Sequence, residues 1–566
     1  MSPPLPGGAT PFQADILALQ LELYRHNEDT INAAVDGYTP QFERYAARYR
    51  RTVRKVDGPA RLERLIEATH EADVTLVGDY HTLSQSQRTF YRLLRRQPED
   101  DADVVVALEM FPASHDENLA KFVAGRIQEK TLLRRVGHVD RWPFGSLLPL
   151  RPVFDLCRER GWRVIGIDTD SSAPLDERDA FAAERIAVAL AEGGRAFVLI
   201  GEMHLAPAHL PRSLKQTLPK KSRVLRVHQN PERIWFDQAA QGVVDDHEVL
   251  RIGPDAFALL TASPVVCQQS FLTWLDRLQD GEIESPRALD ADAAEDLFVH
   301  AAKMIARALD LGLGEALDHV EIVGPSDLHF FDRLCRSGMF TRQEAKQIKA
   351  HILASESYYI PRARLVYLAT FSINHAAEEA SHFLRHHVSG EGLEDPQGMV
   401  DAFYGRILNE AIGFMGSKLV NPKRKCVHVR DLKKLVADAD APPAPRGHRR
   451  RAPRLASTGG HEAGGLSAMD IETAQYVVAH KRMERGTKVP WLAQVFDSDA
   501  QLFNAVTHAL GYILGDQLYY ALVRGVLTKD DARRLYAEPF EDEGAALMLY
   551  FELATRVRNV RIPQRT

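Results

Sequence analysis

The sequence has little of what marks a secreted or membrane-spanning protein. Its 566 residues include only four cysteines, which are far apart and form no Cys-x-x-Cys pair, so we expect free thiols in a reducing compartment. No window reaches the roughly 18 uninterrupted apolar residues that a membrane helix needs. The first residues carry neither a signal peptide nor a lipid-bearing cysteine. These absences predict a cytoplasmic protein with no membrane partner.

A strong excess of charge of one sign is also lacking. The formal net charge is -6 and the isoelectric point is near 6.4, so nothing indicates nucleic acid as a partner. Hydrophobic residues make up 45% and charged residues 26%, as in ordinary globular proteins. The length suggests two to four domains at about 150 residues each. A homodimer is left open as the assembly.

Short apolar runs alternate with helical patterns between residues 71 and 288. The runs lie at residues 74–77, 103–108, 163–167, 196–200, 223–227, 248–252 and 257–261. Such alternation is typical of βαβ units. We therefore expect an α/β fold with a mainly parallel sheet and helices on both faces, followed by a mostly α-helical C-terminal region. Residues 1–70 are expected to form a helical N-terminal extension.

After residue 288 the strand signals stop and helical patterns form two blocks, residues 289–437 and 467–566, which we expect to pack together. A Pro- and Gly-rich linker at 438–466 is predicted to be disordered. The blocks look like a degenerate duplication: the stretch from Gly338 resembles that from Gly525, and each is followed by a helix with Leu-Ala-Thr.

The first helical block holds a polar constellation, with His375, Glu379 and His382 on one helix face. A di-metal site of the ferritin type would need a second Glu-x-x-His, and none is found in the helical half. We therefore expect a solvated, salt-bridged face here.

The ends of the predicted strands carry the chemistry. Two of them run into Gly78-Asp79-Tyr80-His81 and Gly201-Glu202-Met203-His204, and others end at Glu109 and Asp168. Because the carboxyl ends of parallel strands meet at one edge, we expect these side chains to converge. Histidines and carboxylates can hold a metal with an open position or activate water directly. Each group alone could instead be a helix cap or a hydrogen-bonded loop residue.

The order of these motifs resembles the ChaN-like proteins, which share a superfamily with the Tiki proteases and the erythromycin esterases. The resemblance covers roughly residues 74–227. The matching stretches are Gly78-Asp79-Tyr80-His81, Leu108-Glu109-Met110-Phe111, Arg141-Trp142-Pro143-Phe144, Ile165-Gly166-Ile167-Asp168, Arg178-Asp179 and Gly201-Glu202-Met203-His204. The first motif has Asp79 where the family usually has Glu, and the lipoprotein start of many members is missing.

The resemblance implies an α/β fold with a site on the histidine and glutamate positions. It also implies two different activities, haem binding for iron uptake or hydrolysis, the latter metal dependent in Tiki proteins. The candidate catalytic residues are His81, Glu109, Glu202 and His204, the candidate metal ligands are His81, Glu109 and His204, and the candidate cofactor-binding residues are Tyr80, Arg141 and Trp142.

Three functions follow as hypotheses, so whether the protein is an enzyme stays undecided. The first is a hydrolase of small molecules or peptides that uses a divalent metal ion or a metal-free, esterase-like mechanism. The second is a protein that binds haem in the same crevice, with Tyr80, His81 or His204 as the axial ligand. The third is a non-catalytic scaffold with a helical interaction module.

Overall fold

The structure is a computed structural model of the whole chain. It describes residues 8–563 except 36–37, 99–102, 138–141, 143, 145–146, 171–172, 192–193, 280–290, 325–328, 354–356, 370–371, 391–397, 441–467 and 541. The chain divides into two compact units, the first built on residues 20–286 and the second on residues 287–562, with residues 10–19 counted in the second.

The first unit is built on an eight-stranded sheet with the order β1-β7-β8-β6-β2-β5-β3-β4. Its strands are β1 (Gly58–Ala60), β2 (Val74–Asp79), β3 (Val104–Pro112), β4 (Arg163–Asp168), β5 (Arg195–Gly201), β6 (Val224–Gln229), β7 (Val249–Gly253) and β8 (Ala256–Leu259). All pairings are parallel except those of β7, which runs antiparallel to β1 and β8. The sheet is therefore mainly parallel, as predicted.

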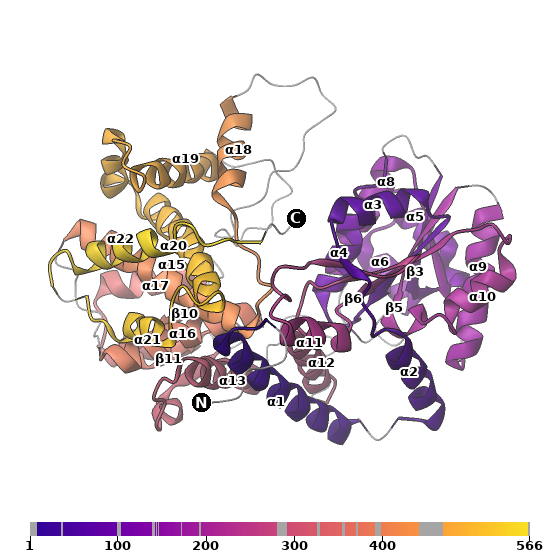
Figure 1. The fold of residues 1–566 in the computed structure, drawn as a ribbon, viewed down its shortest axis with the longest axis horizontal. Helices are drawn as coiled ribbons and strands as arrows, with labels where there is room; N and C mark the ends of the chain where they lie inside the picture. Colours follow the sequence, from indigo (N-terminus) through magenta and orange to yellow (C-terminus); the bar gives the residue numbers. More distant parts are fainter. Residues whose placement is uncertain are drawn as a thin grey trace. The chain divides into compact units, whose positions relative to one another are not determined.

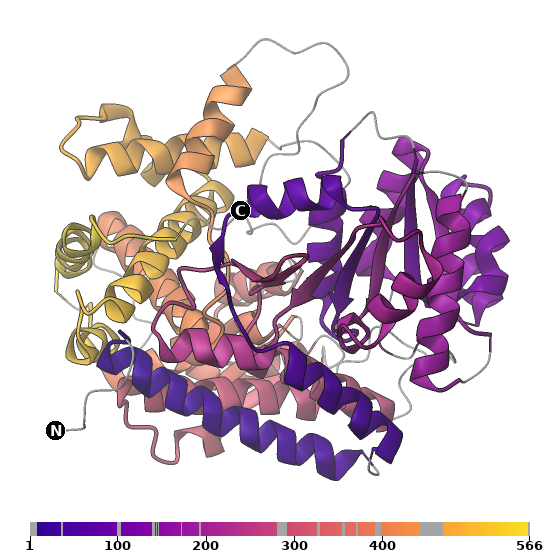
Figure 2. The same cartoon turned by 45° about the vertical axis from the view of Figure 1, so that its right-hand side comes forward.

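Helices cover both faces of this sheet (Figure 1 and Figure 2). Along β5, Phe197 and Leu199 join one apolar core, while Val198 and Ile200 join the other. The first core includes residues of α3 (Leu62–Glu71), α4 (Ser84–Leu94), α5 (Asp116–Val123), α6 (Glu129–Val136) and α8 (Arg151–Arg160), and the second includes residues of α9 (Leu175–Ala191) and α10 (Leu210–Thr217). Strands buried on both faces read as continuous apolar runs, which is why the sequence revealed them. The predicted α/β class is confirmed.

Strand order brings the candidate site together. β5 lies between β2 and β3, with Asp79 opposite Gly201 and Leu108 opposite Leu199. Three neighbouring strands therefore deliver their carboxyl ends, and the side chains that follow, to one stretch of the sheet edge. The N-terminal part adds α1 (Pro11–Ala34), α2 (Pro40–Thr52) and the short edge strand β1, which interrupts the expected helical extension.

The second unit is mostly helical, which confirms the expected C-terminal region. Its helices are α13 (Ala291–Leu309), α14 (His329–Ser337), α15 (Arg342–Leu353), α16 (Ile373–Ser389), α17 (Met399–Val420), α18 (Val429–Asp440), α19 (Ala468–Met483), α20 (Ala500–Val523), α21 (Lys529–Ala537) and α22 (Ala545–Val557). The expectation that strands end before this region is wrong, because β9 (Glu321–Val323), β10 (Tyr358–Ile360) and β11 (Leu365–Tyr367) form a small sheet. Most of the predicted linker, from residue 441 on, lies outside the described residues. Among the helices that the structure describes, none is long and apolar enough to cross a membrane.

The expected duplication holds only at two helix starts. Gly338 and Gly525 both have positive φ, at 70° and 69°, and a Thr three residues later caps α15 and α21 with an acidic partner. The second Leu-Ala-Thr lies in α22, but Leu368 follows strand β11 and is not helical. The prediction of a helix at the first Leu-Ala-Thr is therefore wrong.

The polar constellation on α16 is not a solvated face. Glu378 and Glu379 are only 7% and 5% exposed, Glu378 pairs with Arg424 at 2.9 Å, and His382 Nε2 lies 3.2 Å from the Asn409 carbonyl on α17. The predicted ion pairs are present, but the predicted solvation is wrong because the helix is enclosed by its neighbours, which helical spacing alone does not reveal.

Candidate functional site

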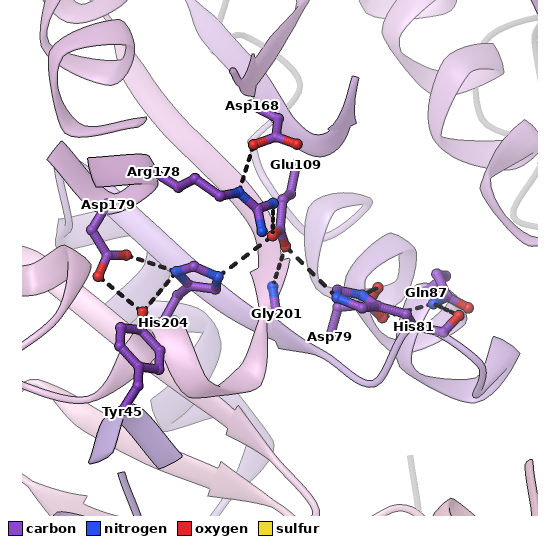
Figure 3. Close-up of polar contacts among 10 residues, drawn as sticks. All are labelled: Tyr45, Asp79, His81, Gln87, Glu109, Asp168, Arg178, Asp179, Gly201 and His204. Carbon is purple, nitrogen blue, oxygen red and sulfur yellow. Dashed lines mark hydrogen bonds and ion pairs between the residues drawn. The ribbon is translucent and has the colours of Figure 1, made fainter. Parts of the chain in front are cut away.

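Glu109, which follows the last β3 residue paired with β5, is the centre of the site (Figure 3). Its Oε2 accepts a hydrogen bond from the Gly201 backbone N–H at 2.6 Å, and its Oε1 accepts one from Arg178 Nη2 at 2.7 Å. His204 Nε2 lies 3.5 Å from Oε1, and His81 Nε2 lies 4.0 Å from Oε2. One buried carboxylate is thus faced by two imidazole rings and a guanidinium, so His81, Glu109 and His204 converge as the sequence suggested.

Two groups contact Nδ1 of His204, the ring nitrogen that does not face Glu109. It lies in the short turn Glu202–Leu205 after β5, where it is 5% exposed. Its Nδ1 is 2.7 Å from Asp179 Oδ1, on α9, and 2.9 Å from the Tyr45 hydroxyl, on α2. The Tyr45 hydroxyl donates to the other oxygen of Asp179 at 2.9 Å. The ring is therefore fixed with Nε2 towards Glu109.

His81 is held in a similar way by a different acid. Its Nδ1 lies 3.0 Å from Asp79 Oδ2, and Gln87 Nε2 donates to Asp79 Oδ1 at 2.7 Å. The side chain of His81 is 24% exposed, against 7% for that of His204. His81 is therefore the more accessible of the two rings, and a histidine backed by a carboxylate is oriented for proton transfer or ligation.

Aromatic side chains lie beside the exposed histidine. The ring centroid of Trp142 is 4.5 Å from that of His81, and the centroid of Phe144 is 5.1 Å away. Phe144 lies 4.9 Å from Trp274 of α12 (Pro264–Gln279), which in turn lies 5.0 Å from Phe271. His81 thus borders a run of aromatic rings.

Arg178 links two carboxylates. Besides Glu109, its Nε donates to Asp168 Oδ1 at 2.7 Å, at the end of β4. Burial alone would lower the pKa of Arg178, but the charges of Glu109 and Asp168 raise it above its ordinary value. The guanidinium is therefore a fixed positive charge at the site.

Charge pairing sets the protonation of the central groups. Burial would raise the pKa of Glu109, but the positive charges of His204, His81 and Arg178 hold it well below its ordinary value. Burial would lower the pKa of His204, but Glu109 and Asp179 raise it to about 9. The pKa of His81 is also raised, because the hydrogen bond to Asp79 and the charge of Glu109 outweigh burial. At neutral pH Glu109 is therefore a carboxylate and His204 an imidazolium.

Glu202 forms a separate network. Its Oε1 accepts from the Tyr49 hydroxyl at 2.5 Å and lies 2.6 Å from His228 Nδ1, and its Oε2 accepts from the Gln229 N–H at 2.9 Å. A Cβ on Gly78 would lie 1.7 Å from Glu202 Oε2, so this arrangement requires glycine there. The structure thus groups Glu202 with β6 and α2, away from the contacts of Glu109.

The predicted cofactor-binding residues are also separated. Trp142 is 9% exposed and lies against His81. Burial, and then the charges of Cys267 and Glu232, raise the pKa of the Tyr80 phenol well above its ordinary value. Arg141 lies outside the described residues. Of the two that the structure describes, Trp142 is the one that contacts a histidine.

Three contributors were not among the predicted site residues. Arg178 and Asp179 stood in the sequence as a helix start, and the signal that could have found them is an acid and a base placed soon after the strand that ends at Asp168. Tyr45 is 159 positions from His204, and no sequence signal joins them.

A divalent metal fits this arrangement poorly. A zinc ion would need its ligand atoms at about 2.0–2.2 Å. Both Glu109 oxygens instead accept hydrogen bonds, one from Arg178 and one from Gly201. The fixed positive charge of Arg178 beside the same carboxylate also opposes a cation. Within the described part of the chain, no group of three or more His, Cys, Asp or Glu side chains is placed to hold a metal ion. Metal ligation by His81, Glu109 and His204 therefore stays a prediction.

Residues 65–174 match the family described as "Haem-binding uptake, Tiki superfamily, ChaN". The resemblance seen in the motifs is thus confirmed over a segment that includes His81, Glu109 and Trp142 and ends before Asp179 and His204. No curated protein matches the chain. A solved structure titled "The structure of the type III effector HopBA1" is similar over 36% of this chain and 96% of that chain, at 15% identity; its TM-score of 0.26 is too low to support an argument.

Proposed function

We propose, from the premise that residues 65–174 carry a segment of the ChaN/Tiki superfamily, that the chain is a hydrolase that uses two histidines as acid and base. The substrate class would be an ester or amide of a small molecule or peptide. The observation that carries the proposal is the pair of carboxylate-backed imidazoles whose Nε2 atoms both face Glu109.

The two histidines would have different tasks. In its neutral form, His81 would take a proton from water at Nε2, while Asp79 holds the proton on Nδ1. The 4.0 Å between His81 Nε2 and Glu109 Oε2 is longer than a direct hydrogen bond and is a distance that a water molecule can bridge. The greater exposure of His81 supports this assignment.

His204 would act as the proton donor. The water oxygen would bond to the substrate carbonyl carbon, the bond to the leaving group would break, and His204 would protonate the leaving oxygen or nitrogen from Nε2. The proton gained by His81 would then replace the one lost by His204 through solvent. The raised pKa of His204 supports this role, because the ring stays protonated at neutral pH.

The test compares hydrolysis of p-nitrophenyl esters and of fluorogenic peptides by the purified protein and by His81→Gln and His204→Gln variants. Loss of a general acid or base typically lowers the rate by about 10²- to 10⁴-fold. The matched control is His26→Gln, an exposed histidine of α1. Equal rates for all variants, or no hydrolysis by the wild type, would reject the proposal. Loss of activity in EDTA that zinc restores would favour the metal-dependent alternative over direct acid–base catalysis.

Haem binding is the second candidate, and the aromatic rings beside His81 favour it. Trp142 and Phe144 could pack on a porphyrin while His81 Nε2 approaches its iron. The matched family is described as haem-binding, which adds support. A bound haem would supply an iron centre with a characteristic Soret band.

Haem titration separates this candidate from the hydrolase. If haem binds, His81→Ala should abolish the Soret shift, whereas Tyr80→Phe should keep it because the groups that act on the Tyr80 phenol are Cys267 and Glu232 rather than the two histidines. A wild-type protein that produces no Soret shift would exclude haem as its ligand.

The four cysteines are all unpaired, which supports a reducing, cytoplasmic location as part of the proposal.

A further inference from the structure

Helix α2 reaches the site through one buried side chain, Tyr45. The residue is 2% exposed, and its ring stacks on His209 with centroids 3.6 Å apart and planes at 11°. His209 is itself fixed, since its Nδ1 lies 2.7 Å from the Met203 carbonyl. The Tyr45 hydroxyl therefore has a defined position between Asp179 and His204.

The surroundings of His204 Nδ1 determine which ring nitrogen carries a proton. Tyr45 donates its hydroxyl hydrogen to Asp179 Oδ2, so its oxygen faces His204 Nδ1 as an acceptor at 2.9 Å. Asp179 Oδ1 is a second acceptor, 2.7 Å from the same nitrogen. Nδ1 thus has two close acceptors and no donor among these contacts, whereas Nε2 faces one acceptor, Glu109 Oε1, at the longer distance of 3.5 Å. Nδ1 therefore keeps its hydrogen, and a proton that the ring gives up leaves from Nε2.

We propose that Tyr45 and Asp179 are positioning residues that fix His204 in the Nδ1–H form, so that proton exchange takes place at Nε2, facing Glu109. This inference rests on the proposed role of His204 as proton donor. It adds that α2, which lies before the matched segment at residues 65–174, is part of the working site. Tyr49, one turn later on α2, binds Glu202 instead.

The tautomer of His204 can be measured without a substrate. Protein with ¹⁵N-labelled histidine is studied by NMR over a series of pH values that ends where the His204 ring is neutral. His204→Gln identifies the signals of this residue by their loss. In the wild type we expect the Nδ1 signal in the protonated range and the Nε2 signal in the unprotonated range.

Two variants should shift these signals. Tyr45→Phe removes only the hydroxyl, and Asp179→Asn can turn its amide NH₂ towards Nδ1, so both should move Nδ1 towards the unprotonated range, Asp179→Asn further. Tyr49→Phe is the matched control, since it removes a hydroxyl from the same helix without touching His204, and it should leave the signals in place.

Unchanged signals in both Tyr45→Phe and Asp179→Asn would overturn the inference, as would an equal shift in Tyr49→Phe. Thermal unfolding of each variant shows whether the fold is kept. If the tautomer shifts as expected but no hydrolysis is found, only the proposed function fails, because this readout does not depend on turnover.

Discussion

His81 and His204 stand in motifs that look alike, yet they obtain their carboxylates from different places. Asp79, two residues before His81, binds its Nδ1, whereas Glu202, two residues before His204, does not. His204 uses Asp179 of α9 instead. Asp79, which has the shorter side chain of the two acids, is therefore the one that pairs with the histidine of its own motif.

The charge of His204 should make stability depend on pH. Its pKa is about 9 in the folded protein and near 6.5 when unfolded, so its contribution is complete below pH 6.5 and is lost as pH rises through 9. We expect the free energy of unfolding to fall by on the order of 3 kcal/mol over this range. Urea unfolding at several pH values measures it. His204→Gln should make the curve shallower but not flat, because the pKa of His382 is also raised to about 9. His26→Gln should leave the curve unchanged, and a flat wild-type curve would contradict the assignment.

Asp79 should control the protonation of His81. Asp79→Asn removes the charge and the acceptor that favour the imidazolium, so the pKa of His81 should fall. Histidine NMR titration measures this value directly. If His81 also acts as a base, the acidic limb of the rate profile should move to lower pH with it. A His81 pKa that does not change would mean that Glu109 alone sets it.

At the scale of elements, α17 and α20 pack unusually closely. A Cβ on Gly511 would lie 2.3 Å from the Glu410 Cβ, and one on Gly515 would lie 2.5 Å from the Ala411 carbonyl oxygen. Between the two helices Lys418 Nζ and Asp516 Oδ1 form an ion pair at 2.6 Å, with both side chains no more than 3% exposed. The two helices thus enclose a positive and a negative side chain, each of which would be a buried, uncompensated charge without the other.

Removal of one partner of this ion pair should lower the free energy of unfolding more than replacement of both partners by apolar side chains. Lys418→Met alone leaves Asp516 buried and unpaired, which typically lowers the free energy of unfolding by about 3–5 kcal/mol. The double variant Lys418→Met with Asp516→Leu should recover most of this loss, because neither charge then remains. Urea unfolding of the two single variants and the double variant gives the coupling energy. Additive losses would show that the pair is not coupled.

At the scale of the molecule, each unit has its own core. The sheet unit holds the candidate site, and among the described residues Arg178, Gly201, His81 and His204, which face Glu109, belong to it. Helix α1 is continuous, although its residues 11–19 are counted with the helical unit and 20–34 with the sheet unit. The domain boundaries expected at residues 288 and 467 stay predictions.

Removal of the helical unit tests the scaffold hypothesis. A fragment of residues 20–288 should fold, because both faces of its sheet are covered by its own helices. Retained hydrolysis or haem binding in this fragment would indicate that the helical unit serves partners or assembly. Circular dichroism and thermal unfolding establish folding first, and loss of activity in a folded fragment would show that the helical unit contributes to the site.

The sequence alone located the main strands of the sheet and three residues of the site. Buried parallel strands are continuous apolar runs, so β2 to β6 could be located, and the residues that follow their carboxyl ends could be expected at one edge. His81, Glu109 and His204 were found in this way. The burial of Glu378 and Glu379 could not be found, since helical spacing shows which residues share a face but not what covers it.

Only the tertiary structure decided the partners of these residues. Tyr45 and Asp179 reach His204 from helices far away in the chain, and Glu202, although it stands in the repeated motif, turns to Tyr49 and His228. Hydrogen-bond partners depend on distances of about 3 Å between side chains. Sequence patterns fix the period and the end of an element, but packing of helices on the sheet sets those distances.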